Sequence, residues 1–230
     1  MTISGQAFLD RREAGRILAA HLREQIHPGE AVVCALPRGG VPVGLEVARA
    51  LDVPLEILLV RKLGVPWQRD IAMGAIASGG YEVLNPDVIR AYGITPLQVA
   101  EIADREMGEL RRCEALYCEG RPAFEVAGRV VYLVDDGLAS GFTMRAALGA
   151  LREYGARQVI VAVPVAAGHV CEEISPEAHA VVCPFVPDSF QSVAHHYRNF
   201  EPVTEREVIT CLASAASYGE VAPAGRFGPR

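Results

Sequence analysis

The 230-residue chain has few of the features that would tie it to a membrane or to nucleic acid. No apolar run approaches the length of a membrane span, and residues 1–10 lack the apolar core of a signal peptide. We therefore expect a cytoplasmic protein without a membrane partner. The net charge is -6, from 22 basic and 28 acidic residues, and no long basic stretch exists. This composition argues against nucleic acid as a main partner.

Cysteine motifs and common nucleotide-binding motifs are also missing. The 6 cysteines are scattered without Cys-x-x-Cys spacing, mostly in apolar runs, as expected for reduced thiols rather than for zinc ligands or disulfides. No Gly-x-x-x-x-Gly-Lys-Ser/Thr segment occurs, and no Gly-x-Gly-x-x-Gly segment follows a strand. A kinase or a dehydrogenase on a nucleotide-binding fold is therefore disfavoured.

Short apolar runs typical of buried strands alternate with helix-periodic segments along the chain. Strands are expected at 31–36, 54–60, 130–134, 158–163 and 179–183, and helices at 10–24, 41–51, 95–117, 141–154, 168–174 and 204–215. A loop is expected at 63–70, and a hairpin around Ser78-Gly79-Gly80. The alternation predicts an α/β fold, with a central, mostly parallel sheet that helices cover on both faces. We expect a single domain at 1–216, with an insertion at about 79–128 and a flexible tail at 217–230.

The most informative segment is 130–143, where a β-branched apolar run ends in two adjacent carboxylates, Asp135 and Asp136. A loop of small and hydroxylated residues follows, and then a helix-periodic run. Such a loop can direct backbone N–H groups and the hydroxyls of Ser140 and Thr143 at an anion. The carboxylates would repel that anion but suit sugar hydroxyls and hydrated Mg²⁺. The segment therefore predicts a phosphorylated sugar as ligand.

A simpler interpretation of the same segment stays open. The chain could form an ordinary strand, loop and helix, in which Asp135 and Asp136 only cap the helix. Replacement of both by Asn separates the two hypotheses, because only a ligand site would lose Mg²⁺-dependent binding.

The segment resembles the phosphoribosyl-pyrophosphate (PRPP) motif of the type I phosphoribosyltransferases, with Ser140-Gly141-Phe142-Thr143 in place of Thr-Gly-x-Thr. The resemblance implies a type I phosphoribosyltransferase-like fold with a small hood. It also implies that Asp135 and Asp136 hold the ribose hydroxyls and, largely through water, a Mg²⁺ cofactor. The 5′-phosphate would bind the loop that follows, at residues Ala139, Ser140, Gly141, Phe142 and Thr143.

Two further loops follow the first two predicted strands. Paired glycines in Pro37-Arg38-Gly39-Gly40 let the backbone approach a ligand closely, and Arg38 adds a phosphate-binding fork. By the resemblance, Arg38, Gly39, Gly40 and Arg61 bind pyrophosphate, and the peptide that joins Pro37 to Arg38 is cis. A basic pair like Arg61-Lys62 precedes a mobile loop in adenine phosphoribosyltransferases, so 63–70 would be a lid. Lys62 would join Asp135 and Asp136 as a catalytic residue, while Arg61 could equally be a surface cation.

The acceptor is the part of the reaction that the sequence does not identify. Residues 187–190 resemble the Pro-Asp-x-Phe segment of hypoxanthine-guanine phosphoribosyltransferases, so Phe190 is expected to stack on the acceptor, with Phe142 beside it and Phe185 as a competitor. Ala139 and Phe142 replace the residues with which 6-oxopurine enzymes read the base. The layout over about residues 8–210, which opens Asp10-Arg11-Arg12, resembles a bacterial group whose acceptor is not established.

The sequence thus favours a phosphoribosyltransferase that joins the phosphoribosyl group of PRPP to a nitrogenous acceptor and releases pyrophosphate. A PRPP- or nucleotide-sensing regulator without turnover is the alternative, because the same fold could bind without reacting. His195 and His196 are expected at the surface or behind the site. The resemblance also implies a homodimer.

Overall fold

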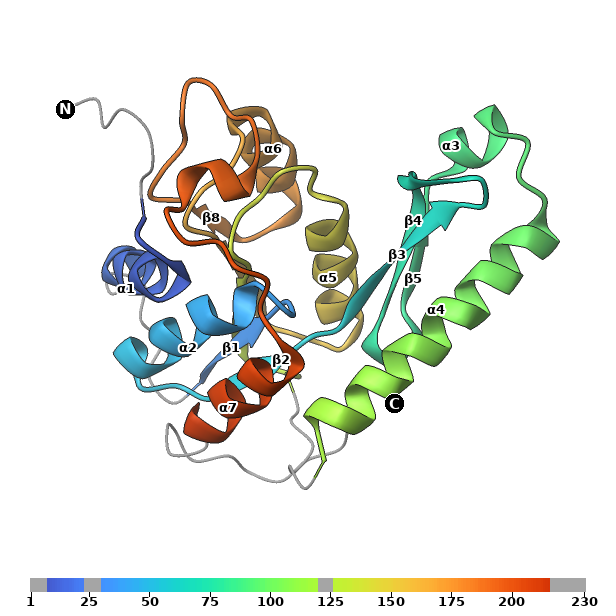
Figure 1. Cartoon of the computed structure of the whole chain (residues 1–230). Coiled ribbons are helices and arrows are strands. Elements are labelled where there is room, and N and C mark those ends of the chain that lie inside the picture. The colour runs from blue at the N-terminus through green and yellow to red at the C-terminus, as the bar shows by residue number, and fades with distance from the viewer. Residues whose placement is uncertain (1–7, 23–29, 120–125, 216–230) are drawn as a thin grey trace.

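The computed structural model describes residues 8–22, 30–119 and 126–215. Its centre is a five-stranded sheet in the order β2-β1-β6-β7-β8, and every neighbouring pair is parallel (Figure 1). The strands are β1 (Ala31–Ala35), β2 (Leu55–Ile57), β6 (Val130–Val134), β7 (Gln158–Ala162) and β8 (Ala180–Val182). β1 and β6 are buried along their whole length, as apolar strands inside a parallel sheet must be.

Helices cover both faces of this sheet, as predicted. Side chains of a strand alternate between faces, so Val33 and Tyr132 join one core cluster while Val32 and Leu133 join the other. The first cluster also contains residues of α1 (Arg11–Leu22), α2 (Gly40–Leu51) and α7 (Glu205–Ala215), and the second those of α5 (Phe142–Glu153) and α6 (Gly168–Ile174). The mostly parallel α/β architecture is therefore confirmed.

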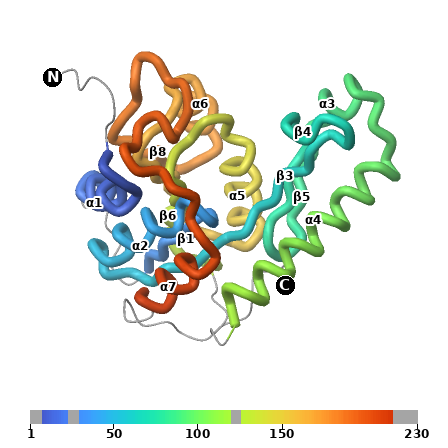
Figure 2. The backbone as a smooth tube through the Cα atoms, viewed as in Figure 1, coloured from blue at the N-terminus to red at the C-terminus, as the bar shows by residue number. Residues whose placement is uncertain are grey.

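A smaller antiparallel sheet stands beside the main one, in the order β3-β4-β5 (Figure 2). Its strands are β3 (Val60–Val65), β4 (Gln68–Ala77) and β5 (Glu82–Leu84), with α3 (Pro86–Ala91) and α4 (Pro96–Tyr117) after them. The predicted turn is present as a 3-10 segment at Ser78–Gly80. The 22 residues of α4 begin at a capping box of Thr95 and Gln98, as the sequence indicated.

The prediction of a loop at 63–70 is wrong. Residues up to Val65 continue β3, and Gln68 already belongs to β4, so only a tight turn separates the two strands. Gly64 and Pro66 favoured a loop at the sequence level, but the buried side chains of Leu63 and Val65 hold the first arm of a hairpin. Helix α3 was not predicted. The predicted tail at 217–230 lies outside the described residues, and the predicted domain and insertion boundaries stay predictions.

Aromatic side chains form a small cap over one end of the main sheet, which we call the hood. It contains Phe8, Phe185, Phe190, Tyr197 and Phe200, and Phe8 pairs with Tyr197 through a parallel bridge. Two 3-10 segments, Ser175–Glu177 and Val193–His196, lie in the chain around β8 and the hood. His195 lies at the surface, one of the two positions expected for the histidines, whereas His196 is 3% exposed. A place for His196 behind the site stays a prediction. Among the described residues, no helix combines the length and apolar character that crossing a bilayer requires.

Candidate functional site

The two loops predicted to bind phosphate leave the sheet side by side. Ala35 pairs with Val134 at the carboxyl ends of β1 and β6, and the backbone N–H of Leu36 donates to the carbonyl of Val134 at 2.8 Å. Ligands of open parallel sheets bind beyond the carboxyl ends of the strands. Neighbouring strands therefore bring residues about one hundred positions apart to one edge.

Two helices begin at this edge, and neither has a side-chain cap. Gly39 precedes α2 and Gly141 precedes α5, and neither helix carries an acidic residue in its first turn. Gly141 has φ 71°, a left-handed conformation that glycine adopts without strain. The uncapped N–H groups of α5 and the positive ends of two helix dipoles favour an anion here. In α2 the N–H groups of Gly40 and Val41 already donate to the carbonyls of Leu36 and Arg38.

Glycine is required where the two loops touch. A Cβ added to Gly40 would lie 2.7 Å from the carbonyl oxygen of Val134 and 2.9 Å from the Cα of Asp135. A Cβ added to Gly39 would overlap Oδ2 of Asp136. The paired glycines therefore let the loop after β1 pack directly against the two acidic residues. The peptide between Pro37 and Arg38 is cis, as the resemblance implied.

These loops open into a cavity of about 480 Å³, which we call the main cavity. Its described lining includes Pro37 from the first loop, Asp135 and Thr143 from the second, and Lys62 from β3. Ser140 and Thr143 are exposed, so the turn after β6 is not sealed beneath other side chains. One space large enough for a small metabolite thus holds members of each predicted group, namely Asp135 for the sugar, Thr143 for its phosphate, and Arg61 and Lys62 for the leaving group. The other predicted residues, Arg38, Gly39, Gly40, Asp136 and 139–142, are not among its described lining residues.

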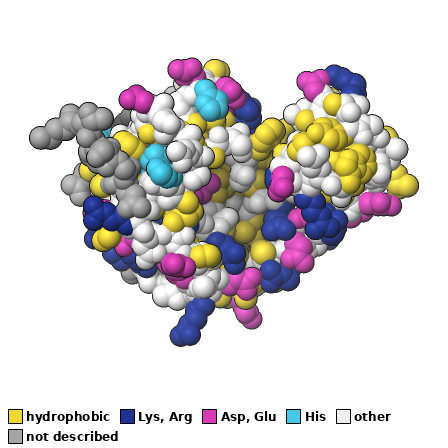
Figure 3. Space-filling model, turned by 45° about the horizontal axis from the view of Figure 1, so that its top comes forward, with side chains coloured by type: hydrophobic (Ala, Val, Ile, Leu, Met, Phe, Trp, Pro, Cys, Tyr) yellow, Lys and Arg dark blue, Asp and Glu magenta, His cyan; other side chains and the backbone are white. Residues whose placement is uncertain are grey.

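The main cavity is positively charged although the protein is acidic overall. Its described lining has four cations and two carboxylates, namely Arg61, Lys62, Arg69 and Arg105 against Glu106 and Asp135. Lys62 is the only lysine of the chain, and its Nζ donates to the carbonyl of Asp70 at 3.1 Å. Figure 3 shows the surface hollowed between the two sheets, with Lys and Arg side chains around the hollow. A locally positive cavity in a protein of net charge -6 favours an anionic ligand.

The two adjacent carboxylates have different surroundings. Asp135 lines the main cavity, and its Oδ1 accepts the backbone N–H of Asp136 at 2.8 Å. Burial, and then the charge of Asp136, raise the pKa of Asp135 well above its ordinary value. Asp136 points instead toward α1, where its Oδ2 accepts from Nε of Arg11 at 2.7 Å. Burial raises the pKa of Asp136 too, although the Arg11 hydrogen bond opposes the change.

Arg11 and Tyr197 were not predicted as site residues, yet both hold the acidic turn. Arg11 lies 3.8 Å above the ring of Phe200 and donates to the carbonyl of Glu201 at 2.8 Å. The hydroxyl of Tyr197 donates to the carbonyl of Asp136 at 2.6 Å, and burial raises its pKa. The only signal in the sequence was the opening Asp10-Arg11-Arg12, since the contacts join residues far apart in the chain.

The donor set fits Mg²⁺ that arrives with a phosphorylated substrate. Among the described residues no group of three or more His, Cys, Asp or Glu side chains could hold a metal by itself. Mg²⁺ usually takes only one or two protein carboxylates and completes its shell with water and substrate phosphate oxygens. A cation at Asp135 would also offset the cost of an ionised carboxylate that is desolvated beside another acid.

The two predicted acceptor residues do not meet in the main cavity. Phe142 begins α5 and is half-buried, and neither it nor Phe190 is among the described lining residues. Phe190 stacks on His196, with ring centroids 5.5 Å apart at 29°. Phe185 contacts the same imidazole edge-on at 5.5 Å. The roles of both predicted acceptor residues therefore stay predictions.

Comparison with known proteins decides the family. The model of the phosphoribosyl transferase domain matches residues 6–198. The chain belongs to the phosphoribosyl transferase family. The family relationship agrees with the resemblance of the segment at 130–143 and with the observed fold.

Two sets of proteins are similar to this chain over most of its length. Proteins from two strains of Mycobacterium tuberculosis, provisionally named phosphoribosyl transferases, are 40% identical over 208 residues, which cover 90% of this chain and 47% of theirs. The chain thus spans about half the length of these curated relatives. The crystal structure of TT1426 from Thermus thermophilus is similar at 40% identity and a TM-score of 0.80, over 92% of this chain and 100% of that one.

Proposed function

We propose that the protein is a Mg²⁺-dependent phosphoribosyltransferase that uses PRPP and a small nitrogenous acceptor. A nitrogen of the acceptor would form a bond to C1 of the ribose while the bond from C1 to the pyrophosphate oxygen breaks. The observation that carries this proposal is the main cavity, which Asp135, Thr143, Lys62 and Pro37 line together. One phosphorylated sugar with a polyanionic leaving group matches that combination of groups.

Each part of the cavity suits one part of the donor. The uncapped N-terminus of α5, with the loop at 139–143, would bind the 5′-phosphate. Asp135 would accept hydrogen bonds from ribose hydroxyls and contact the waters of Mg²⁺. Lys62, with Arg38, Arg61 and the loop of Gly39 and Gly40, would stabilise the negative charge of the departing pyrophosphate. Catalysis would rest on positioning and electrostatics, without a dedicated general base.

Asp135→Asn is the sharpest test of the binding site. Asparagine keeps an oxygen that can accept the N–H of Asp136, so the substitution removes charge while the loop keeps its hydrogen bond. Isothermal titration calorimetry with PRPP and Mg²⁺ should detect binding to the native protein and a loss of at least about tenfold in this variant. Asp52→Asn is the matched control, because Asp52 is exposed at the end of α2 with φ 53°, which Asn tolerates. Equal affinity of the native protein and Asp135→Asn would contradict the site.

Turnover is tested separately from binding. Release of pyrophosphate from PRPP is measured while a panel of purine, pyrimidine and simple amine acceptors is offered. Release with one acceptor class supports the transferase and names its substrate. PRPP binding without release for any acceptor would instead favour the sensing regulator. A homodimer is also proposed, and sedimentation of the full chain would measure it.

A further inference from the structure

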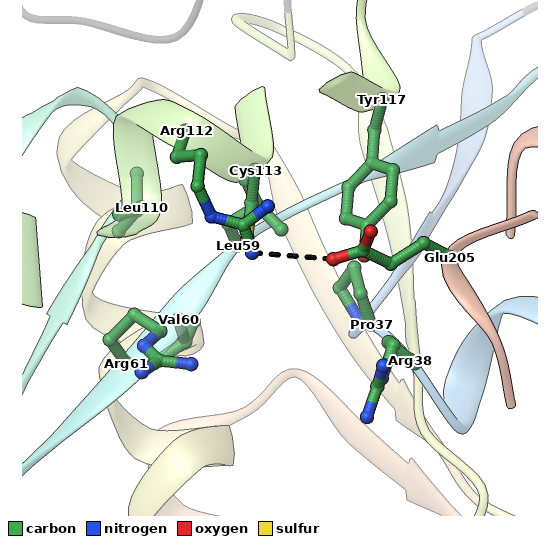
Figure 4. A pocket seen from close by; sticks show the side chains of 10 residues that line it. All are labelled: Pro37, Arg38, Leu59, Val60, Arg61, Leu110, Arg112, Cys113, Tyr117 and Glu205. Atoms are coloured by element: carbon green, nitrogen blue, oxygen red, sulfur yellow. Dashed lines mark hydrogen bonds and ion pairs between the residues drawn. The ribbon is translucent and has the colours of Figure 1, made fainter. Parts of the chain in front are cut away.

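A second cavity of about 280 Å³ lies between β3 and α4, and we call it the α4 cavity (Figure 4). It shares Pro37, Val60 and Arg61 with the main cavity, so the two spaces adjoin across the start of β3. Most of its remaining wall comes from α4, which contributes Arg112, Cys113 and Tyr117 among others, and Glu205 of α7 stands at its border.

Three arginines from three different elements reach this cavity. Arg38 comes from the loop after β1, Arg61 from β3 and Arg112 from α4 (Figure 4). Guanidinium groups form paired hydrogen bonds with phosphate oxygens and stay protonated at all ordinary pH values. Arg61 also donates from Nε and a terminal nitrogen to Glu106, at 3.0 and 2.8 Å, so a ligand would compete with that carboxylate too. Three guanidinium charges around one small space suit a ligand that carries several negative charges.

Arg112 is held by internal carboxylates in the structure. Its Nε donates to Glu109 at 3.1 Å, and a terminal nitrogen donates to Glu205 at 3.2 Å. These two hydrogen bonds, Glu109 first, raise the pKa of Arg112. The side chains of Arg112 and Glu205 are 53% and 43% exposed, and such exposed ion pairs contribute little to stability. A ligand with several negative charges can therefore displace Glu205.

We propose that the α4 cavity binds an oligophosphate group, with Arg112 as a binding residue and Glu205 as its internal competitor. The assignment extends the proposed function, because the cavity adjoins the space assigned to the sugar donor. Two sources share this chemistry, namely the diphosphate of PRPP itself and a separate oligophosphate effector. In either case the insertion helix α4 takes a direct part in anion binding.

Opposite substitutions on the two partners test the proposal in the full chain. Inorganic tripolyphosphate is the probe, and calorimetry is the measurement. Arg112→Met should weaken its binding about tenfold, because one charge-assisted donor set is lost. Glu205→Gln should strengthen binding several-fold, because the competitor loses its charge. Arg111→Met is the matched control, since this exposed neighbour on α4 is not among the lining residues, and it should bind like the native protein.

A second readout does not depend on affinity. Cys113 is partly exposed and lines the α4 cavity, so bound tripolyphosphate should slow its alkylation by iodoacetamide. Cys118, partly exposed at the end of the same helix, should react at an unchanged rate. Peptide mass spectrometry distinguishes the two sites. Native-like binding by Arg112→Met, or alkylation of Cys113 that tripolyphosphate leaves unchanged, would overturn the proposal.

Competition with PRPP identifies the source of the group. Displacement of tripolyphosphate by PRPP assigns the cavity to the leaving group, whereas simultaneous binding assigns it to a separate effector. The proposed function fails independently, since it requires PRPP binding that Asp135→Asn weakens by at least about tenfold. If the protein binds tripolyphosphate in an Arg112-dependent manner but does not bind PRPP, the proposed transferase function is wrong and the proposed oligophosphate site stands.

Discussion

Arg11 and Asp136 form an ion pair that clamps the hood to the acidic turn. The two side chains are 11% and 14% exposed, and the guanidinium also rests on Phe200 and on the carbonyl of Glu201. This pair explains why adjacent carboxylates can differ in role. Asp136 is committed to an internal partner, which leaves Asp135 as the acid that faces the main cavity.

Arg11→Met should destabilise the protein by about 3 kcal/mol, because it leaves a desolvated carboxylate without its partner. The loss in Arg11→Met/Asp136→Asn should be smaller, since the unpaired charge is then also gone. Arg12→Met is the control: Arg12 is 42% exposed, and its partner Glu46 keeps Arg49, so less than about 1 kcal/mol should be lost. Urea unfolding measures all three. Equal losses of stability in Arg11→Met and Arg12→Met would show that the Arg11–Asp136 ion pair stabilises the protein no more than an exposed ion pair does.

Glycine-to-alanine changes at two helices should have opposite signs. Gly40→Ala should cost about 1–3 kcal/mol, because the new methyl would press against the backbone of Val134 and Asp135. It should also weaken PRPP binding, since the loop must shift. Gly108→Ala, inside α4 with nothing within 4 Å of the added Cβ, should instead stabilise by about 0.5–1 kcal/mol. Thermal and urea unfolding of both variants check this contrast.

His196 should make stability depend on pH. Burial, and then the nearby His195, lower the pKa of His196, and neither ring nitrogen has a partner among the described residues. The unfolded chain therefore binds a proton more readily than the folded one as the pH falls through about 6.5, and stability falls with it. His196→Phe suits the aromatic surroundings and should lose less stability than the native protein between pH 7.5 and pH 5.5.

The matched control for this pH dependence is His169→Phe, at an exposed position on α6. That variant should keep the native difference between urea midpoints at the two pH values, because it retains the buried imidazole of His196. A native-like difference in His196→Phe would mean that the buried imidazole does not contribute to the pH dependence.

Lys62 can be followed by chemistry that no other side chain of the protein shares. As the only lysine, it should be the one side chain that an amine-specific acetylating reagent modifies, besides the α-amino group. Its exposed position on β3 leaves it accessible in the free protein. PRPP with Mg²⁺ should slow acetylation of Lys62 several-fold while the α-amino group reacts as before. Unchanged labelling of Lys62 in the presence of bound PRPP would remove it from the proposed site.

Local sequence patterns predicted the strands of the main sheet, but they did not predict the contacts between segments that are distant in the chain. The strands at 130–134 and 31–35 were visible as short β-branched runs, and the loops after them carried their glycines, acids and hydroxyls in adjacent positions. Because a parallel sheet brings such loops to one edge, a shared cavity followed from the alternation of elements.

The insertion was harder to predict because its strands pair with each other rather than with the main sheet. Gly64 and Pro66 favoured a loop, and only the partner strand β4 makes residues 60–65 a strand. Helix α3 has its signal in Asn85 followed by Pro86, a capping residue and a first-turn proline, but its six residues are too few for a clear period. Arg11 lies 125 positions from Asp136, and no local pattern encodes that distance.

The scarcity of lysine has a consequence for the electrostatics of both cavities. Apart from Lys62, the cations at their described walls are all arginines, whose charge does not change between pH 5 and pH 10. The positive charge that these basic side chains offer to a ligand is therefore the same across the physiological pH range. A change in anion affinity with pH would then originate in acidic groups, among them the ligand's own phosphate and Asp135, whose pKa burial raises. The protein would sense acidity through what it binds more than through its own basic groups.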